Sequence, residues 1–95
     1  MKKFILLFVG YTKPTKKVRD AWMQWFESIR NHIVDSGNPF GLVKEVTSLG
    51  VRELPRNKNA ITGYTIIKAR DMAEAEKIAK SCPIASTSVY EAMPI

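Results

Sequence analysis

Residues 4–9, the stretch FILLFV, decide the fold prediction because every position in them is apolar. Successive side chains of a strand point to opposite faces, so a strand with one face in water alternates apolar and polar residues. This stretch has no such alternation. It therefore predicts a strand that is covered on both faces.

The residues around this strand bear on localisation. Lys2 and Lys3 before this strand resemble the basic start of a secretory signal peptide. The following Tyr11-Thr12-Lys13-Pro14, however, contains no small-residue cleavage site. We interpret residues 4–9 as the first strand of a mature cytoplasmic protein.

A repeat of apolar residues at steps of three and four follows and predicts an amphipathic helix. Thr15 is a suitable N-cap. We expect the helix to run to about Ser36, with Gly37 just beyond its end and Pro39 preventing continuation. The apolar stripe consists of Val18, Trp22, Trp25, Phe26, Ile29 and Ile33.

The rest of the chain predicts four more strands and a second helix. Residues 40–47 and 51–54 are expected to form a hairpin, and residues 61–67 a strand rich in β-branched side chains. Asp71 and Glu74 resemble a capping box that starts a helix ending before Pro83. Residues 88–93 form the last short strand.

This order predicts one α+β domain over residues 1–95: a ferredoxin-like split β-α-β sandwich with both helices on one face of an antiparallel sheet. The other face is then open, and the first strand exposes either Ile5, Leu7 and Val9 or their alternates. Exposed apolar patches usually mark interfaces. We therefore expect a homodimer that packs sheet against sheet.

Composition excludes several classes of protein. The chain has 95 residues, of which 45% are hydrophobic and 25% charged, as in globular rather than disordered or fibrous proteins. Its six-residue apolar run is too short to span a membrane, so no membrane partner is expected. One cysteine and one histidine give no basis for a disulfide or a transition-metal site, and no phosphate-loop, haem or flavin motif is present. We expect neither metal nor cofactor.

Short motifs in a fixed order resemble those of a known family. They are Gly10-Tyr11, Lys13-Pro14-Thr15, Trp22, Trp25-Phe26, Gly37-Asn38-Pro39-Phe40, Ile61-Thr62-Gly63-Tyr64, Ser81-Cys82-Pro83 and Val89-Tyr90-Glu91. In this order they resemble the YciI-related (YCII) family, which includes DGPF-type domains. The resemblance implies a ferredoxin-like domain that forms a dimeric α/β barrel.

The resemblance leaves open whether the protein is an enzyme. Some members are cofactor-independent enzymes on small organic substrates, with a His–Asp pair proposed as the acid–base site. The corresponding region of this chain lies around Trp22 and contains no histidine. We therefore do not transfer that pair.

The candidate catalytic residues are His32, Asp35 and Tyr64. His32 and Asp35 are three residues apart, so they would touch across one turn of a helix, and histidine titrates near neutral pH. The alternative is a boundary histidine favoured by the helix C-terminus. A ligand cleft is expected between the first helix and the sheet, and its candidate lining residues are Trp22, Trp25, Asn38, Tyr64 and Tyr11.

Lysines gather where the first helix begins. The net charge is +6, and the excess lies in the first 30 residues. Lys13, Lys16 and Lys17 lie beside the free N–H groups of the predicted helix start, a combination typical of an anion site. The alternative is a solvated basic surface. Cys82 is expected on the buried face of the second helix, as a structural residue.

Two functions remain. The first is a homodimer that binds a small organic molecule, neutral or anionic, and performs cofactor-free acid–base chemistry. The second is an RNA-binding module, because RRM domains share this order of elements. Phe4 or Phe8 with Tyr64 would supply the stacking aromatics, but the full motif is missing and a buried sheet face cannot bind bases. We therefore favour the first function and do not expect a nucleic-acid partner.

Overall fold

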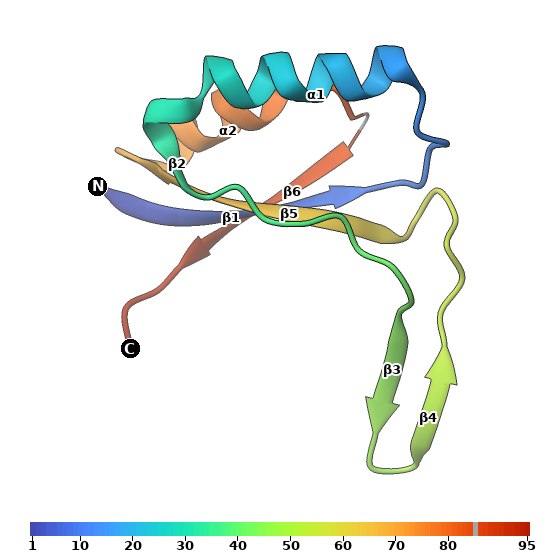
Figure 1. Ribbon diagram of the computed structural model, residues 1–95. Helices are drawn as coiled ribbons and strands as arrows, with labels where there is room; N and C mark the ends of the chain where they lie inside the picture. Colours follow the sequence, from blue (N-terminus) through green and yellow to red (C-terminus); the bar gives the residue numbers. More distant parts are fainter. Residues whose placement is uncertain (85) are drawn as a thin grey trace.

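The computed structural model describes residues 1–84 and 86–95, and has two helices on one face of a four-stranded antiparallel sheet (Figure 1). The strand order is β2-β5-β1-β6, as in a ferredoxin-like sandwich. The predicted fold class is confirmed. The elements are β1 (Lys2–Val9), α1 (Lys16–Ser28), the 3₁₀-helix η1 (Arg30–His32), β2 (Ile33–Asp35), β3 (Lys44–Thr47), β4 (Gly50–Glu53), β5 (Ile61–Ala69), α2 (Met72–Lys80) and β6 (Ser86–Ala92).

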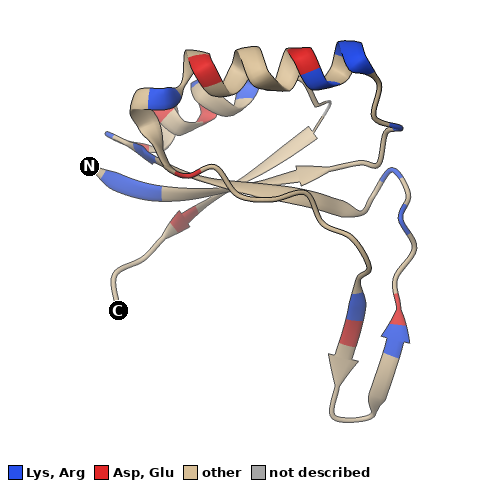
Figure 2. Cartoon of the chain, in the orientation of Figure 1, with Lys and Arg blue, Asp and Glu red and all other residues tan. Residues whose placement is uncertain are grey.

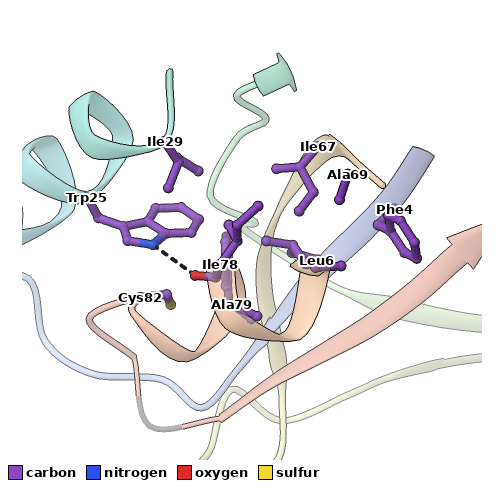
Figure 3. Packing of buried hydrophobic residues seen from close by; sticks show 11 residues of the cluster. Phe4, Leu6, Trp25, Ile29, Ile67, Ala69, Ile78, Ala79 and Cys82 are labelled. Atoms are coloured by element: carbon purple, nitrogen blue, oxygen red, sulfur yellow. Dashed lines mark hydrogen bonds between the residues drawn. The ribbon is translucent and has the colours of Figure 1, made fainter. Parts of the chain in front are cut away.

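Strand β1 lies in the centre of the sheet and separates two apolar surfaces. It pairs with β5 on one side and β6 on the other. Phe4, Leu6 and Phe8 are buried beneath the helices, and Figure 3 shows the cluster that they join. Ile5 and Leu7 point to the opposite face and remain partly exposed. The sequence expectation of an apolar side chain on both faces of this strand is confirmed.

Helix α1 begins as predicted and is joined to α2 through a tryptophan. The Thr15 side chain accepts a hydrogen bond from the Val18 N–H, at 3.2 Å. Trp25 is only 3% exposed, and its Nε1–H donates to the Ile78 carbonyl at 3.3 Å (Figure 3). The same N–H is shared with the Ser81 hydroxyl, at 3.1 Å. A buried indole N–H needs such a partner. The contact fixes one helix against the other.

The predicted end of α1 at Ser36 is wrong. The helix ends at Ser28, and the chain passes through η1 into β2, which the sequence analysis had placed inside the helix. Ile33 continues the apolar spacing, yet it reaches the same core from a strand paired with Ile67. Gly37 is accordingly not a helix terminator. It lies in the turn after β2, with a φ of 79°.

Helix α2 is capped at Asp71, whose Oδ1 accepts from the Glu74 N–H at 2.9 Å. The Glu74 carboxylate reaches back to the N–H of Arg70 rather than to that of Asp71, so the capping box is displaced by one residue. The buried face consists of Ala75, Ile78 and Ala79. This helix confirms the prediction, and it ends at Lys80, ahead of Pro83.

Strands β3 and β4 form a separate hairpin rather than an edge of the main sheet. The hairpin projects from the body of the domain on the side opposite the helices (Figure 1). The predicted pair of strands is confirmed, but the first strand spans Lys44–Thr47 rather than residues 40–47. Instead, residues 36–43 cross from β2 to the hairpin, and Phe40 donates its N–H to the Thr62 carbonyl at 2.8 Å.

Charged side chains lie around the rim of the domain. Figure 2 shows Lys and Arg at the N-terminus, at the start of α1 and along the hairpin. Residues 4–9 and 61–67, which form most of β1 and β5, contain no charged residue. In the described part of the chain, neither helix combines the length and the apolar character needed to cross a bilayer.

Candidate functional site

The side of the main sheet that faces away from the helices, here called the open face, is largely apolar. Its alternating register brings Ile5 beside Tyr90 and Ile66, and Leu7 beside Tyr64. All five side chains are at least partly exposed to solvent. The open face is therefore a largely apolar surface with two phenols, Tyr64 near its β2 edge and Tyr90 on β6.

The phenol of Tyr64 is tied to a carboxylate at this edge. The Tyr64 hydroxyl donates to Asp35 Oδ2 at 3.0 Å. The other oxygen of Asp35 accepts from the Gly37 N–H at 2.9 Å. Asp35 is the last residue of β2, and the pairing of β2 with β5 brings it beside Tyr64 although 29 residues separate them.

The turn from Ser36 to Phe40 holds this pair in position. Tyr64 donates its N–H to the Asn38 carbonyl at 3.4 Å, and its ring stacks on Phe40 with centroids 5.8 Å apart. The buried Thr65 hydroxyl donates to the Ser36 carbonyl at 2.9 Å. Gly37 passes so close to β5 that a Cβ at this position would overlap the Tyr64 carbonyl oxygen. The tight turn therefore requires glycine there.

Asp35 keeps the phenol of Tyr64 protonated. Its hydrogen bond to the carboxylate, and then the negative charge of that carboxylate, raise the pKa of Tyr64 above the usual value of 10.0. Partial desolvation raises it further, and a hydrogen bond with the Asn38 side chain opposes the shift. At neutral pH the hydroxyl is thus a neutral donor whose one proton is given to a carboxylate, and a ligand that displaces this bond would meet one donor and one acceptor.

The structure divides the predicted cleft residues between the two faces of the sheet. Trp22 packs on Phe8 with ring centroids 4.8 Å apart, and on Trp25 at 5.5 Å, so aromatic rings fill the space between α1 and the sheet. Tyr64 lies on the opposite, open face. The expectation that both tryptophans and Tyr64 line one cleft is therefore not met.

Tyr11 lies apart from both groups. It follows the end of β1, where the guanidinium carbon of Arg56 lies 4.6 Å from the centroid of its ring, and its N–H donates to the Asn57 carbonyl at 3.1 Å. These contacts attach the loop after β4 to the end of β1. Tyr11 is thus part of the support of that loop.

His32 and Asp35 do not form the predicted pair, because the chain has left the helix before either residue. His32 Nδ1 lies 3.0 Å from the Lys68 carbonyl oxygen, an acceptor, so this nitrogen carries the proton. Asp35 binds Tyr64 and Gly37 instead. The predicted catalytic candidates thus separate into an Asp35–Tyr64 pair and a histidine held by the backbone.

The phenylalanines proposed for base stacking face the helices. Phe4 and Phe8 are 0% and 5% exposed, on the face of the sheet opposite Tyr64. They cannot stack bases together with it. The described structure thus offers no RRM-like row of aromatics built on these three residues.

The lysine cluster and Cys82 lie away from the open face. Lys13, Lys16 and Lys17 are exposed, and Lys16 Nζ lies 4.0 Å from the Asp20 carboxylate one turn further along α1. Burial raises the pKa of the Cys82 thiol, which keeps it protonated and unreactive. Among residues 1–84 and 86–95, no three His, Cys, Asp or Glu side chains gather as a metal site would require.

Comparison with known proteins assigns the family. The model of the YCII-related domain matches residues 7–95, nearly the whole chain. The chain belongs to the YCII-related domain family. No match was found among proteins of curated function.

This YCII-related domain is also similar in structure to a solved protein. It is 5-chloro-2-hydroxyhydroquinone dehydrochlorinase (TftG) from Burkholderia phenoliruptrix AC1100, in complex with 2,5-dihydroxybenzoquinone. The similarity covers 96% of this chain and 93% of that one, with 14% identity and a TM-score of 0.52. At this identity the likeness establishes a shared fold.

Sequence reasoning named Asp35 and Tyr64 but not their contact, and it missed Phe40 and Thr65. The signal for Phe40 was its place directly after Pro39 in a motif that already contained Asn38. Thr65 had no signal of its own. Its role appears only in the fold, where its buried hydroxyl donates a hydrogen bond to the Ser36 carbonyl of the neighbouring turn.

Proposed function

We propose that this YCII-related domain works as a homodimer in which the open faces of two protomers pack against each other. The exposed surface of one chain supports this. It is 7163 Å², whereas a compact monomer of 10.7 kDa exposes about 5,500 Å². The excess of roughly 1,700 Å² exceeds the roughly 800 Å² that each partner contributes to a standard interface.

The proposed ligand is a small oxygenated organic molecule bound between the two faces, next to Tyr64. The observation that carries this is the hydrogen-bonded Tyr64–Asp35 pair at the edge of a largely apolar surface. Binding sites for small molecules typically combine apolar walls with a few convergent polar groups. The structural relative was solved with 2,5-dihydroxybenzoquinone, which supports a ligand of this size and chemistry.

The chemistry proposed for this site is proton transfer without a cofactor. A ligand hydroxyl that takes the place of the phenol at Asp35 Oδ2 can give its proton to the carboxylate. The released Tyr64 hydroxyl, protonated at neutral pH, then donates a hydrogen bond to the ligand oxygen that gains electron density. Asp35 would act as the base, and Tyr64 as the group that stabilises charge.

Binding of 2,5-dihydroxybenzoquinone tests the site directly. Isothermal titration with wild type, Tyr64→Phe and Asp35→Asn should show binding to wild type that both substitutions weaken by about tenfold, the usual value of one hydrogen bond to a charged or polar partner. His32→Ala is the matched control and should bind like wild type, because this ring is held at the Lys68 carbonyl. Equal affinities for all four proteins would refute the proposed site.

A further inference from the structure

The hairpin of Lys44–Thr47 and Gly50–Glu53, here called the arm, has exposed apolar side chains toward its tip. Glu45 lies opposite Arg52, and their side chains form an ion pair at 2.8 Å. The cross-strand pair Val46–Val51 points to the other side, which it shares with the Lys44–Glu53 pair at the base of the arm. These valines are 74% and 61% exposed, and Leu49 at the tip is 96% exposed. These three side chains, here called the apolar tip, thus face solvent in a single chain.

A free arm of this kind would be marginally stable. Two-stranded hairpins need a third strand or a packed face for independent stability. The turn is supported only locally, by the Thr47 hydroxyl that accepts from the Leu49 N–H at 3.2 Å. Every residue of both strands is exposed. A contact that covers the exposed Val46, Val51 and Leu49 would therefore stabilise the arm.

The direction of the arm indicates which molecule covers it. The arm extends from the domain on the side of the open face, away from both helices (Figure 1). This gives the chain a radius of gyration of 14.4 Å, against about 12 Å for a compact domain of its length. A second copy stacked on the open face would lie beside the arm. Two-fold symmetry would give each protomer one arm and one surface to receive it.

We propose that the apolar tip of the arm, formed by Val46, Val51 and Leu49, packs against the partner protomer at the rim of its open face. This inference rests on the proposed dimer and adds a second contact to it. The base of the arm is suited to hold such a position. Phe40 is bound to β5 through the Thr62 carbonyl, and the Leu54 N–H donates to the Val43 carbonyl at 3.2 Å, which closes the hairpin. The arm therefore reaches the partner from an anchored base.

The test compares substitutions on the two sides of the same hairpin. Val46→Thr/Val51→Thr keeps β-branched side chains but replaces methyl groups that the proposed contact would bury, and symmetry repeats each loss in the partner. Its dimer dissociation constant, measured by sedimentation equilibrium, should rise by about tenfold or more. The matched control Glu45→Thr/Arg52→Thr changes the opposite side and should alter this constant by less than about threefold, since exposed ion pairs contribute little. Equal effects of the two variants would overturn the inference.

Hydrogen exchange supplies a second measurement that does not depend on the valine variants. Amides of residues 44–53 should be protected in the wild-type dimer and exchange faster in the separated chains of Leu7→Lys, whose charge lies on the open face. The same exchange in both states would show that the arm is free. If wild type is itself a monomer, the proposed dimer fails and the arm contact with it. If Leu7→Lys separates the chains but the valine variant has the dissociation constant of wild type, only the arm contact fails.

Discussion

Gly37→Ala should strongly destabilise the protein, because the turn that positions Tyr64 has no room for a side chain. The φ of 79° at Gly37 costs an L-residue about 1–2 kcal/mol. The added Cβ would also overlap the Tyr64 carbonyl oxygen and lie 2.7 Å from its carbonyl carbon. These are backbone atoms of β5, so no side-chain rotation relieves the clash.

Relief requires the turn to move away from β5, which breaks the hydrogen bonds from Tyr64 N–H to Asn38 and from Thr65 to Ser36. At about 1 kcal/mol each, these losses bring the total to about 3 kcal/mol. For a domain of this size, that corresponds to a fall in the melting temperature of about 10–20 °C.

The assay is thermal and urea unfolding followed by tryptophan fluorescence, at one fixed protein concentration. Gly41→Ala is the matched control, since an added Cβ there has no atom within 4 Å and φ is not positive. It should change stability by less than about 1 kcal/mol, in the stabilising direction if at all. If Gly37→Ala proved as stable as Gly41→Ala, the tight contact between this turn and β5 would be refuted.

Three further predictions concern other parts of the domain. Trp25→Phe should lower the free energy of unfolding by about 1–2 kcal/mol in urea titrations, because it removes the N–H donor that joins the two helices; no change would contradict this role. The raised pKa of Tyr64 means that folding favours the neutral phenol. The contribution of this phenol to the free energy of unfolding is therefore complete below pH 10.0 and is lost as pH rises through the folded-state pKa. Tyr64→Phe should remove this alkaline loss of stability, which thermal melts at pH 8–11 would measure. Lys16→Glu/Lys17→Glu should be at least as stable as wild type in low-salt chloride, because it improves the interaction with the helix dipole. Phosphate should then raise the wild-type melting temperature by more than that of the variant, and an equal gain would show that these lysines are only solvated charges.

The sequence predicted the parts of the fold that depend on local patterns. The apolar run of residues 4–9 indicated a strand with two apolar faces, and Thr15 and Asp71 marked the helix starts because capping is a short-range interaction. The end of α1 was missed, since Ile33 fits the helical spacing while lying in β2. An apolar residue can reach one core from a helix or from a strand, and periodicity alone does not separate the two.

The candidate site was harder to predict because it depends on strand pairing. Asp35 was assigned to a helix with His32, whereas the register of β2 on β5 turns it to Tyr64. Likewise, Trp22 and Tyr64 both looked suitable for a ligand cleft, but they lie on opposite faces of the sheet. Such placement follows from non-local register, and no short motif encodes it.

The proposed interface at the open face is tested most directly by the mass of the protein in solution. Light scattering of wild type at about 100 µM should give about twice the 10.7 kDa chain mass, the commonest closed assembly. Leu7→Lys, which places a charge in the middle of the open face, should give the mass of one chain with the same circular dichroism spectrum. A wild-type mass of one chain, or a Leu7→Lys variant that remains fully dimeric, would contradict the open face as the dimer interface.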